Sequence, residues 1–211
     1  MKLYIIRHGE TYWNIEGRLQ GRTDIELTPS GISIADRSSQ GMKNIRFDYI
    51  FSSPLKRAYK TAEIIRRDRS IPIITDNRLI EVCFGNYEGM VVDNRKGNLA
   101  LFFDNPEAFI PCNGAESYEE ILGRSREFIE DVIYPLAEKN PESTVLISGH
   151  GGINKALMTI LLGSPLSDFW KGTYRGNCAV DIFEIVNGNI SHIEEAKYYY
   201  SVERTCRGIF S

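Results

Sequence analysis

The sequence has few of the side chains that bind metals or form disulfides. Its 211 residues include three histidines and four cysteines. The cysteines stand at positions 83, 112, 178 and 206, without a Cys-x-x-Cys pair or a Cys–His spacing typical of a metal site. We therefore interpret them as the reduced thiols of a cytoplasmic protein. We expect no metal ion and no other cofactor.

Long hydrophobic runs and a strong net charge are also absent. The first apolar run ends at Ile6, before Arg7 and His8, and is too short for a signal peptide or a membrane span. The formal charge is −3, so no basic surface for nucleic acid is expected. A small anionic metabolite remains a suitable partner, because its pocket needs only a few local cations. The sequence leaves open whether the chain forms a homo-oligomer.

The chain does have a regular alternation of short apolar runs and helical segments. Strand-like runs occur at residues 3–6, 47–51, 71–75 and 144–147. This alternation predicts a three-layer αβα fold, a mostly parallel sheet with helices on both faces. Asn187-Gly188 is typical of a tight hairpin turn, so we expect an antiparallel hairpin over 178–196 at the sheet edge.

The length and composition, with 42% hydrophobic and 25% charged residues, fit a single domain over residues 1–211. Residues 90–116 mix phenylalanines with Gly, Asn and Pro. We expect them to form an irregular lid or substrate-facing excursion; a decorative insertion with its own small core is the alternative. A capping box at Ser117 predicts a long helix that reaches about Lys139.

Two stretches of the sequence share one design. Residues 3–9 read as a buried strand that ends in Arg7, His8 and a glycine, and residues 144–151 repeat the order of strand, His150 and Gly151. Ligands bind at the carboxyl ends of strands in open α/β sheets, and a guanidinium beside an imidazole suits a phosphate. Polar residues at the surface ends of two strands would be the simpler interpretation. Because two of the three histidines occupy the same place, a shared anion site is favoured.

Three more side chains are candidates for that site. Ser53 and Pro54 predict a helix that begins at Pro54, which places Arg57 in its first turn. A cation there opposes the helix dipole unless an anion lies in front of it. Asn14 and Gln20, in the polar loop after the first strand, either donate amide hydrogens to a phosphate or face solvent.

Four motifs resemble those of the histidine phosphatase superfamily, which includes the cofactor-dependent phosphoglycerate mutases. They are RHGET at 7–11, SSPLKRA at 52–58, RLIE at 78–81 with FG at 84–85 and EG at 88–89, and SGHGG at 148–152. They occur in the family's order at compatible spacing and cover the chain from residue 3 to about 155. The resemblance implies a phosphoglycerate mutase-like fold.

The resemblance also implies roles for individual residues. His8 would be the nucleophile that becomes phosphorylated, and Glu81 would be the acid/base. The composition around Glu81 alone favours a surface residue on an alternating strand. Those implied to bind phosphoryl oxygens are Arg7, Arg57 and His150 (the last as an imidazolium), with Asn14 assisting. The predicted phosphate- and substrate-binding set is completed by Gln20, Gly21 and Gly151.

The resemblance implies hydrolysis of a small phosphorylated metabolite through a phosphohistidine. The chain is more similar to the phosphatase branch than to the mutases, because VCFGNYEG follows Glu81 and Arg22 stands where mutases tend to have Trp. Two alternatives stay open, a cofactor-dependent phosphoglycerate mutase and a non-catalytic phosphate-binding module.

Overall fold

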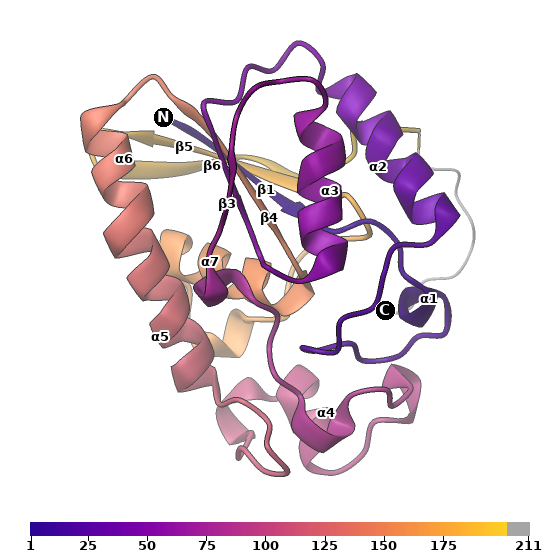
Figure 1. The fold of residues 1–211 in the computed structure, drawn as a ribbon. Coiled ribbons are helices and arrows are strands. Elements are labelled where there is room, and N and C mark those ends of the chain that lie inside the picture. The colour runs from indigo at the N-terminus through magenta and orange to yellow at the C-terminus, as the bar shows by residue number, and fades with distance from the viewer. Residues whose placement is uncertain (202–211) are drawn as a thin grey trace.

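A six-stranded sheet forms the centre of the protein in the computed structural model, which describes residues 1–201 (Figure 1). The strands lie in the order β3-β2-β4-β1-β5-β6. Their bounds are β1 Lys2–Arg7, β2 Tyr49–Ser52, β3 Ile73–Thr75, β4 Thr144–Gly149, β5 Val180–Val186 and β6 Asn189–Lys197. The first four are parallel, whereas β5 runs antiparallel to β1 and β6 antiparallel to β5. The predicted three-layer fold with an antiparallel edge hairpin is confirmed; Cys206 lies outside the described residues.

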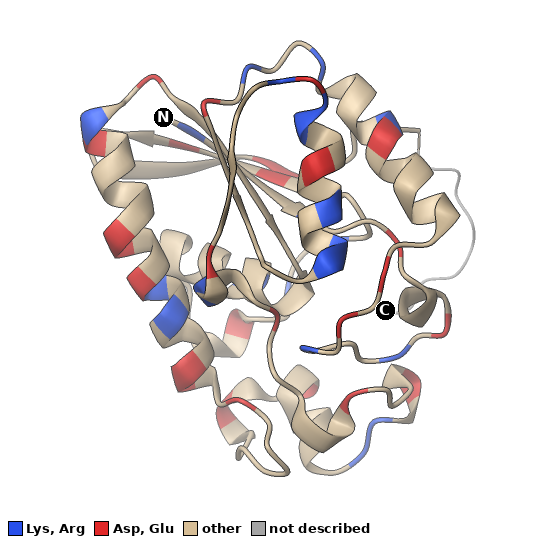
Figure 2. Cartoon of the chain, in the orientation of Figure 1, with Lys and Arg blue, Asp and Glu red and all other residues tan. Residues whose placement is uncertain are grey.

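Both faces of the sheet are covered, which explains why the central strands β1 and β4 are apolar on both sides. Leu3 and Ile5 of β1 pack on α5 (Tyr118–Phe128), α6 (Tyr134–Lys139) and α7 (Gly151–Leu162). The alternate residues Tyr4 and Ile6 pack on α2 (Pro29–Gly41) and α3 (Lys56–Arg66). Complete burial of one such aliphatic side chain stabilises the fold by about 1.5–3 kcal/mol. Figure 2 shows charged residues of both signs along the outer faces of α3, α5 and α6.

The two strands that precede a histidine are neighbours in the sheet. β1 and β4 pair in parallel, with Arg7 opposite Gly149. Parallel neighbours end at the same edge, so the residues that follow them, His8 and His150, meet there. The His8 backbone N–H donates to the Gly149 carbonyl oxygen at 3.0 Å, which holds the two strand ends together.

The long helix and the hairpin are observed with one modification. α5 and α6 follow each other through a π-helical turn over Ile129–Ile133, so the predicted helix to Lys139 contains one locally widened turn. Asn187 and Gly188 have φ angles of 51° and 79°, both in the left-handed region that such a two-residue turn requires. Among residues 1–201, no helix is both long and apolar enough to cross a membrane.

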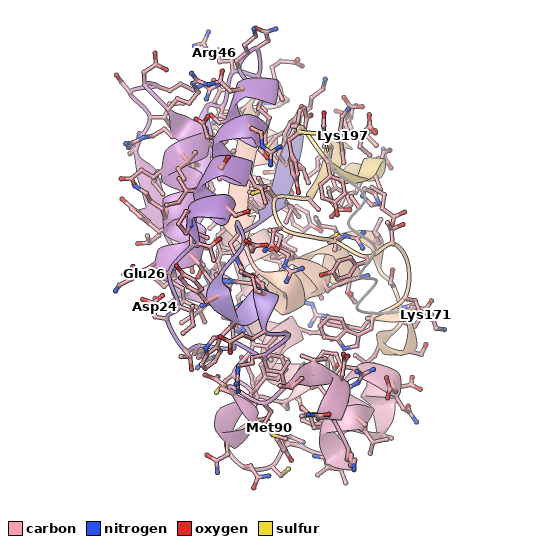
Figure 3. All side chains as sticks on the ribbon, turned by 90° about the vertical axis from the view of Figure 1, so that its right-hand side faces the viewer. Asp24, Glu26, Arg46, Met90, Lys171 and Lys197 are labelled. Carbon is pink, nitrogen blue, oxygen red and sulfur yellow. The ribbon has the colours of Figure 1, made fainter. Side chains whose placement is uncertain are left out.

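The expectation that residues 90–116 are irregular is only partly correct. They contain α4 (Asn98–Asp104) between 3₁₀ turns at Val92–Asn94 and Pro106–Ala108. Phe102 stacks on Tyr118 of α5 with ring centroids 4.8 Å apart, and the same cluster includes Ile153 of α7. The excursion therefore shares its core with the helices of the main body, and Figure 3 shows Met90 on it, at the opposite end of the molecule from Arg46. Its role as a lid stays a prediction.

Candidate active site

His8 is buried at the carboxyl end of β1, with 3% of its surface exposed. Its ring Nδ1 lies 2.7 Å from the Gly9 carbonyl oxygen. A carbonyl oxygen only accepts, so Nδ1 carries the proton and Nε2 keeps a free electron pair. Burial, and then the positive charges of Arg57 and Arg7, hold the pKa of His8 well below its usual value. His8 is thus a neutral imidazole with its Nε2 electron pair available.

His150 lies beside His8, with ring centroids 5.2 Å apart. Its Nδ1 accepts a hydrogen bond from Arg57 Nε at 3.1 Å. The proton therefore sits on Nε2, which donates to Ser53 Oγ at 2.8 Å. Burial, followed by the charge of Arg57, keeps the pKa of His150 well below its usual range. The expected imidazolium is wrong for this structure, because a neighbouring guanidinium needs the ring as an acceptor.

Arg57 occupies the second position of α3, which begins at Lys56 rather than at the predicted Pro54. Its guanidinium is completely buried and donates from Nη1 to the Thr23 carbonyl at 2.8 Å and from Nη2 to the Gly21 carbonyl at 2.7 Å. Burial lowers the pKa of Arg57 to about 10, so it stays charged at neutral pH. With the bond to His150, three of its five N–H groups are used, which leaves two for a ligand.

The loop that receives Arg57 depends on a glycine. Gly21 has a φ of +52°, and a Cβ there would lie 2.1 Å from Glu88 Oε1. Glu88 in turn accepts hydrogen bonds from the backbone N–H groups of Arg22 and Thr23. The close approach of this carboxylate holds the loop against the rest of the site, so Gly21 positions the site through its carbonyl and its missing side chain.

Arg7 has an unused donor inside the protein. Its Nη1 donates to the Arg175 carbonyl at 2.6 Å and to Tyr174 Oη at 3.3 Å. Its Nε is buried and has no partner within residues 1–201. A Cβ on Gly151 would lie 4.0 Å from that Nε and 3.8 Å from Glu81 Oε2, so these groups border one space. A buried guanidinium N–H without an acceptor costs free energy, which indicates that an anion belongs there.

Glu81 is buried, with 8% of its surface exposed, and not on the surface of a strand as its composition suggests. Its Oε1 accepts from the N–H groups of Val82 at 3.0 Å and Ile153 at 2.9 Å, and its Oε2 accepts from Gly152 at 3.2 Å. Two of these donors belong to the first turn of α7, whose positive end favours a carboxylate. The same helix has His150 as its N-cap, so α7 positions both groups.

The two amide candidates differ in their surroundings. Asn14 Oδ1 accepts from the Thr11 backbone N–H and from Asn177 Nδ2, both at 3.1 Å. Its own Nδ2 has no partner in the described part of the chain, as a phosphate ligand requires. Gln20 is buried rather than solvated, and its Oε1 lacks a partner within the same residues. The structure records no hydrogen bond between the Gln20 side chain and the other candidate residues among residues 1–201.

Residues outside the predicted site set support its members. Asn177 Nδ2 donates to the His8 carbonyl at 3.0 Å as well as to Asn14, and Thr61 Oγ1 accepts from the Gly9 N–H at 2.9 Å. Ser53 binds His150 instead of opening a helix at Pro54. Within residues 1–201, no group of three or more His, Cys, Asp and Glu side chains is placed to hold a metal ion.

The two buried imidazoles predict a specific pH dependence of stability. In the unfolded chain each histidine takes up a proton below about pH 6.5, whereas the folded protein keeps both neutral. The unfolding free energy should therefore fall as the pH drops below that value, by up to about 1.4 kcal/mol per pH unit for each imidazole. Urea unfolding between about pH 6.5 and about pH 5 measures this slope. His150→Gln should have a smaller slope, and an equal slope in the two proteins would contradict the prediction.

Fold and site together define an α/β protein with paired histidines and arginines at the carboxyl edge of its sheet. The chain belongs to the histidine phosphatase superfamily, whose branch 1 model matches residues 3–194. It is 35% identical over 174 residues to a putative phosphoserine phosphatase 2 of Hydrogenobacter thermophilus, which covers 81% of this chain and 83% of that protein. The family predicted from the four motifs is confirmed.

Solved structures agree with this assignment. YhfR of Bacillus stearothermophilus superposes with a TM-score of 0.81 at 33% identity, over 90% of this chain and 94% of that one. A mutant phosphoserine phosphatase of Entamoeba histolytica, solved in complex with phosphoserine, superposes with a TM-score of 0.81 at 30% identity, over 93% and 97% of the two chains. The phosphoglycerate mutase-like fold is thereby confirmed.

Proposed function

We propose that the protein is a metal-independent phosphomonoesterase that hydrolyses a small phosphorylated metabolite through a phosphohistidine on His8. The observation that carries the proposal is the free Nε2 electron pair of His8, buried beside two guanidiniums. Arg7 still has an unpartnered buried N–H, and Arg57 has two N–H groups to spare. The phosphatase names of relatives at 30% identity or more support the reaction class and leave the substrate open.

The first chemical step uses the neutral form of His8. A phosphomonoester carries nearly two negative charges at neutral pH, and the guanidiniums of Arg7 and Arg57 compensate them. Glu81 enters this step in its acid form, which the bound phosphate dianion favours over a second negative charge beside it. His8 Nε2 attacks phosphorus, the bond from phosphorus to the ester oxygen breaks, and that oxygen takes the proton from Glu81. The two guanidiniums that bind the phosphate also keep His8 unprotonated. They therefore contribute both to substrate binding and to the nucleophilic form of His8.

The second step returns the site to its starting state. The Glu81 carboxylate accepts a proton from a water molecule, whose oxygen attacks phosphorus as the bond to His8 Nε2 breaks. His150 accepts the Arg57 Nε–H and so directs the remaining N–H groups of that guanidinium toward the phosphoryl group. The ring's one donor, Nε2–H, is bonded to Ser53 Oγ and has to leave it to reach a phosphoryl oxygen. Asn14 Nδ2 donates to that oxygen without breaking a bond of this kind.

Replacement of Glu81 by Gln tests this mechanism through the leaving group. An alkyl phosphate such as glycerol 2-phosphate needs the proton in the first step, so its kcat/KM should fall by about 10²- to 10⁴-fold. The p-nitrophenolate ion leaves without a proton, so E81Q should still release a rapid burst of it, equal to the enzyme concentration. Slow turnover should follow, because water attack still lacks its base. Stopped-flow absorbance measures burst and turnover.

The control for this experiment is Glu127→Gln on the exposed side of α5, which should behave as the wild type. During slow turnover, mass spectrometry at alkaline pH should find the phosphoryl group on His8. Equal losses for both substrates without a burst would contradict the role of Glu81. Strict dependence of activity on 2,3-bisphosphoglycerate would assign the chain to the mutases instead.

A further inference from the structure

Arg22 is a partly exposed cation at the edge of the candidate site. It follows Gly21 in the loop that holds Arg57, and 43% of its side chain is exposed. Its Nε lies 3.4 Å from the Glu81 carbonyl oxygen, and its Nη2 lies 3.3 Å from Glu116 Oε1. The guanidinium therefore touches the backbone of the residue that gives the leaving group its proton.

The carboxylate that Arg22 contacts, Glu116, already has other hydrogen-bond donors. Glu116 is buried and already bound in two places by Arg124, at 2.7 Å and 3.0 Å, and it also accepts from the Cys83 N–H at 3.1 Å. Two guanidiniums thus share one carboxylate, and Arg22 makes the longest of these contacts.

Two other carboxylates near Arg22 have partners of their own. Glu88 accepts from backbone N–H groups of the loop and from Thr23 Oγ1, and Glu120 caps α5 through Ser117. Glu116 keeps its two bonds to Arg124 and its bond to the Cys83 N–H when Arg22 moves, so loss of the 3.3 Å contact leaves no unpaired buried carboxylate. The guanidinium can therefore turn toward an anionic ligand at small cost.

The position of Arg22 relates it to the leaving group rather than to the phosphate. The ester oxygen must lie at Glu81 to receive its proton, so atoms one or two bonds beyond that oxygen come near the adjoining Arg22. A carboxylate matches a guanidinium in shape and charge through two parallel hydrogen bonds. Building on the proposed function, we infer that Arg22 binds a carboxylate of the leaving group, and that the substrates are phosphorylated hydroxy acids or amino acids.

Two matched pairs of substrates test this inference. Phosphoserine has one carboxylate that phosphoethanolamine lacks. In the second pair, 3-phosphoglycerate has a carboxylate where glycerol 1-phosphate has a hydroxymethyl group. The wild type should prefer the carboxylate-bearing member of each pair in kcat/KM. Arg22→Gln should lower kcat/KM for phosphoserine by about 10- to 100-fold, the usual effect of losing hydrogen bonds to a charged group. The same variant should leave kcat/KM for phosphoethanolamine unchanged.

Arg18→Gln is the matched control, because Arg18 lies in the same loop at 41% side-chain exposure and pairs with Glu16 instead. It should retain the preference for phosphoserine, and Arg22→Lys should retain part of it. Equal losses for both members of a pair in R22Q would show that Arg22 only clamps the loop, and would overturn the inference. So would a wild type that does not distinguish the pairs. Failure of the proposed function itself would appear differently, as the absence of a p-nitrophenolate burst from E81Q.

Discussion

His8→Ala should lower kcat for p-nitrophenyl phosphate by a factor on the order of 10⁶, the usual cost of removing a catalytic nucleophile. The variant keeps both guanidiniums, so phosphate should still bind. Chemistry stops because no other described side chain presents a free imidazole electron pair to the same space. Steady-state hydrolysis measures kcat, and isothermal titration with inorganic phosphate measures the retained binding.

His192→Gln is the matched control for the loss of a histidine. His192 lies on the edge hairpin, where it bonds to Asp181 at 3.1 Å and stacks on Phe183. Its replacement should leave kcat unchanged. Equal rates in wild type and His8→Ala would refute catalysis by His8 and would favour a phosphate-binding module without this chemistry. Partial recovery of H8A by added imidazole would show that only the nucleophile is missing.

Arg57→Ala should have the largest combined effect on activity and stability. Removal of one preorganised donor costs about 10²- to 10³-fold in kcat, and Arg57 offers two. The truncation also leaves the carbonyls of Gly21 and Thr23 and the Nδ1 of His150 without their donor. Each buried acceptor that loses its donor costs about 1–3 kcal/mol. Hydrolysis rates and urea unfolding at neutral pH measure the two losses.

A lysine at position 57 shows whether the site needs only the positive charge or also the shape of the guanidinium, and a variant at an exposed arginine is the control. Arg57→Lys keeps the charge, yet an ammonium cannot reach three acceptors in the fixed directions of a guanidinium, so most of both losses should remain. Arg46→Ala is the control, because its side chain is 93% exposed at the far end of the molecule (Figure 3). It should change the unfolding free energy by less than about 0.5 kcal/mol. Full activity of R57A would remove Arg57 from the proposed site.

The meeting of His8 and His150 could be predicted because it follows from sheet topology. Each histidine comes directly after an apolar strand, and parallel strands end at one edge of the sheet. No side-chain detail is needed for that conclusion, only the alternation of strands and helices. Arg57 could be predicted for a similar local reason, since a cation in the first turn of a helix calls for an anion.

Glu81 shows where local sequence is insufficient. Its apolar neighbours are equally compatible with an alternating surface strand and with a buried acid, and the decision comes from α7, which is distant in the chain and supplies backbone donors. The charge state of His150 is decided in the same way, because Arg57 reaches it from α3. Residues 98–104 form a helix since their aromatic side chains find a core on α5 and α7.

The sequence by itself determined the order of the elements, the edge of the sheet where the site lies, and the family, because these depend on periodicity and on short motifs. Only the tertiary structure decided which nitrogen of each imidazole is free, which carboxylate is buried, and which arginine has charge to spare. Those properties depend on hydrogen-bond partners and burial contributed by distant segments, and a linear pattern does not contain them.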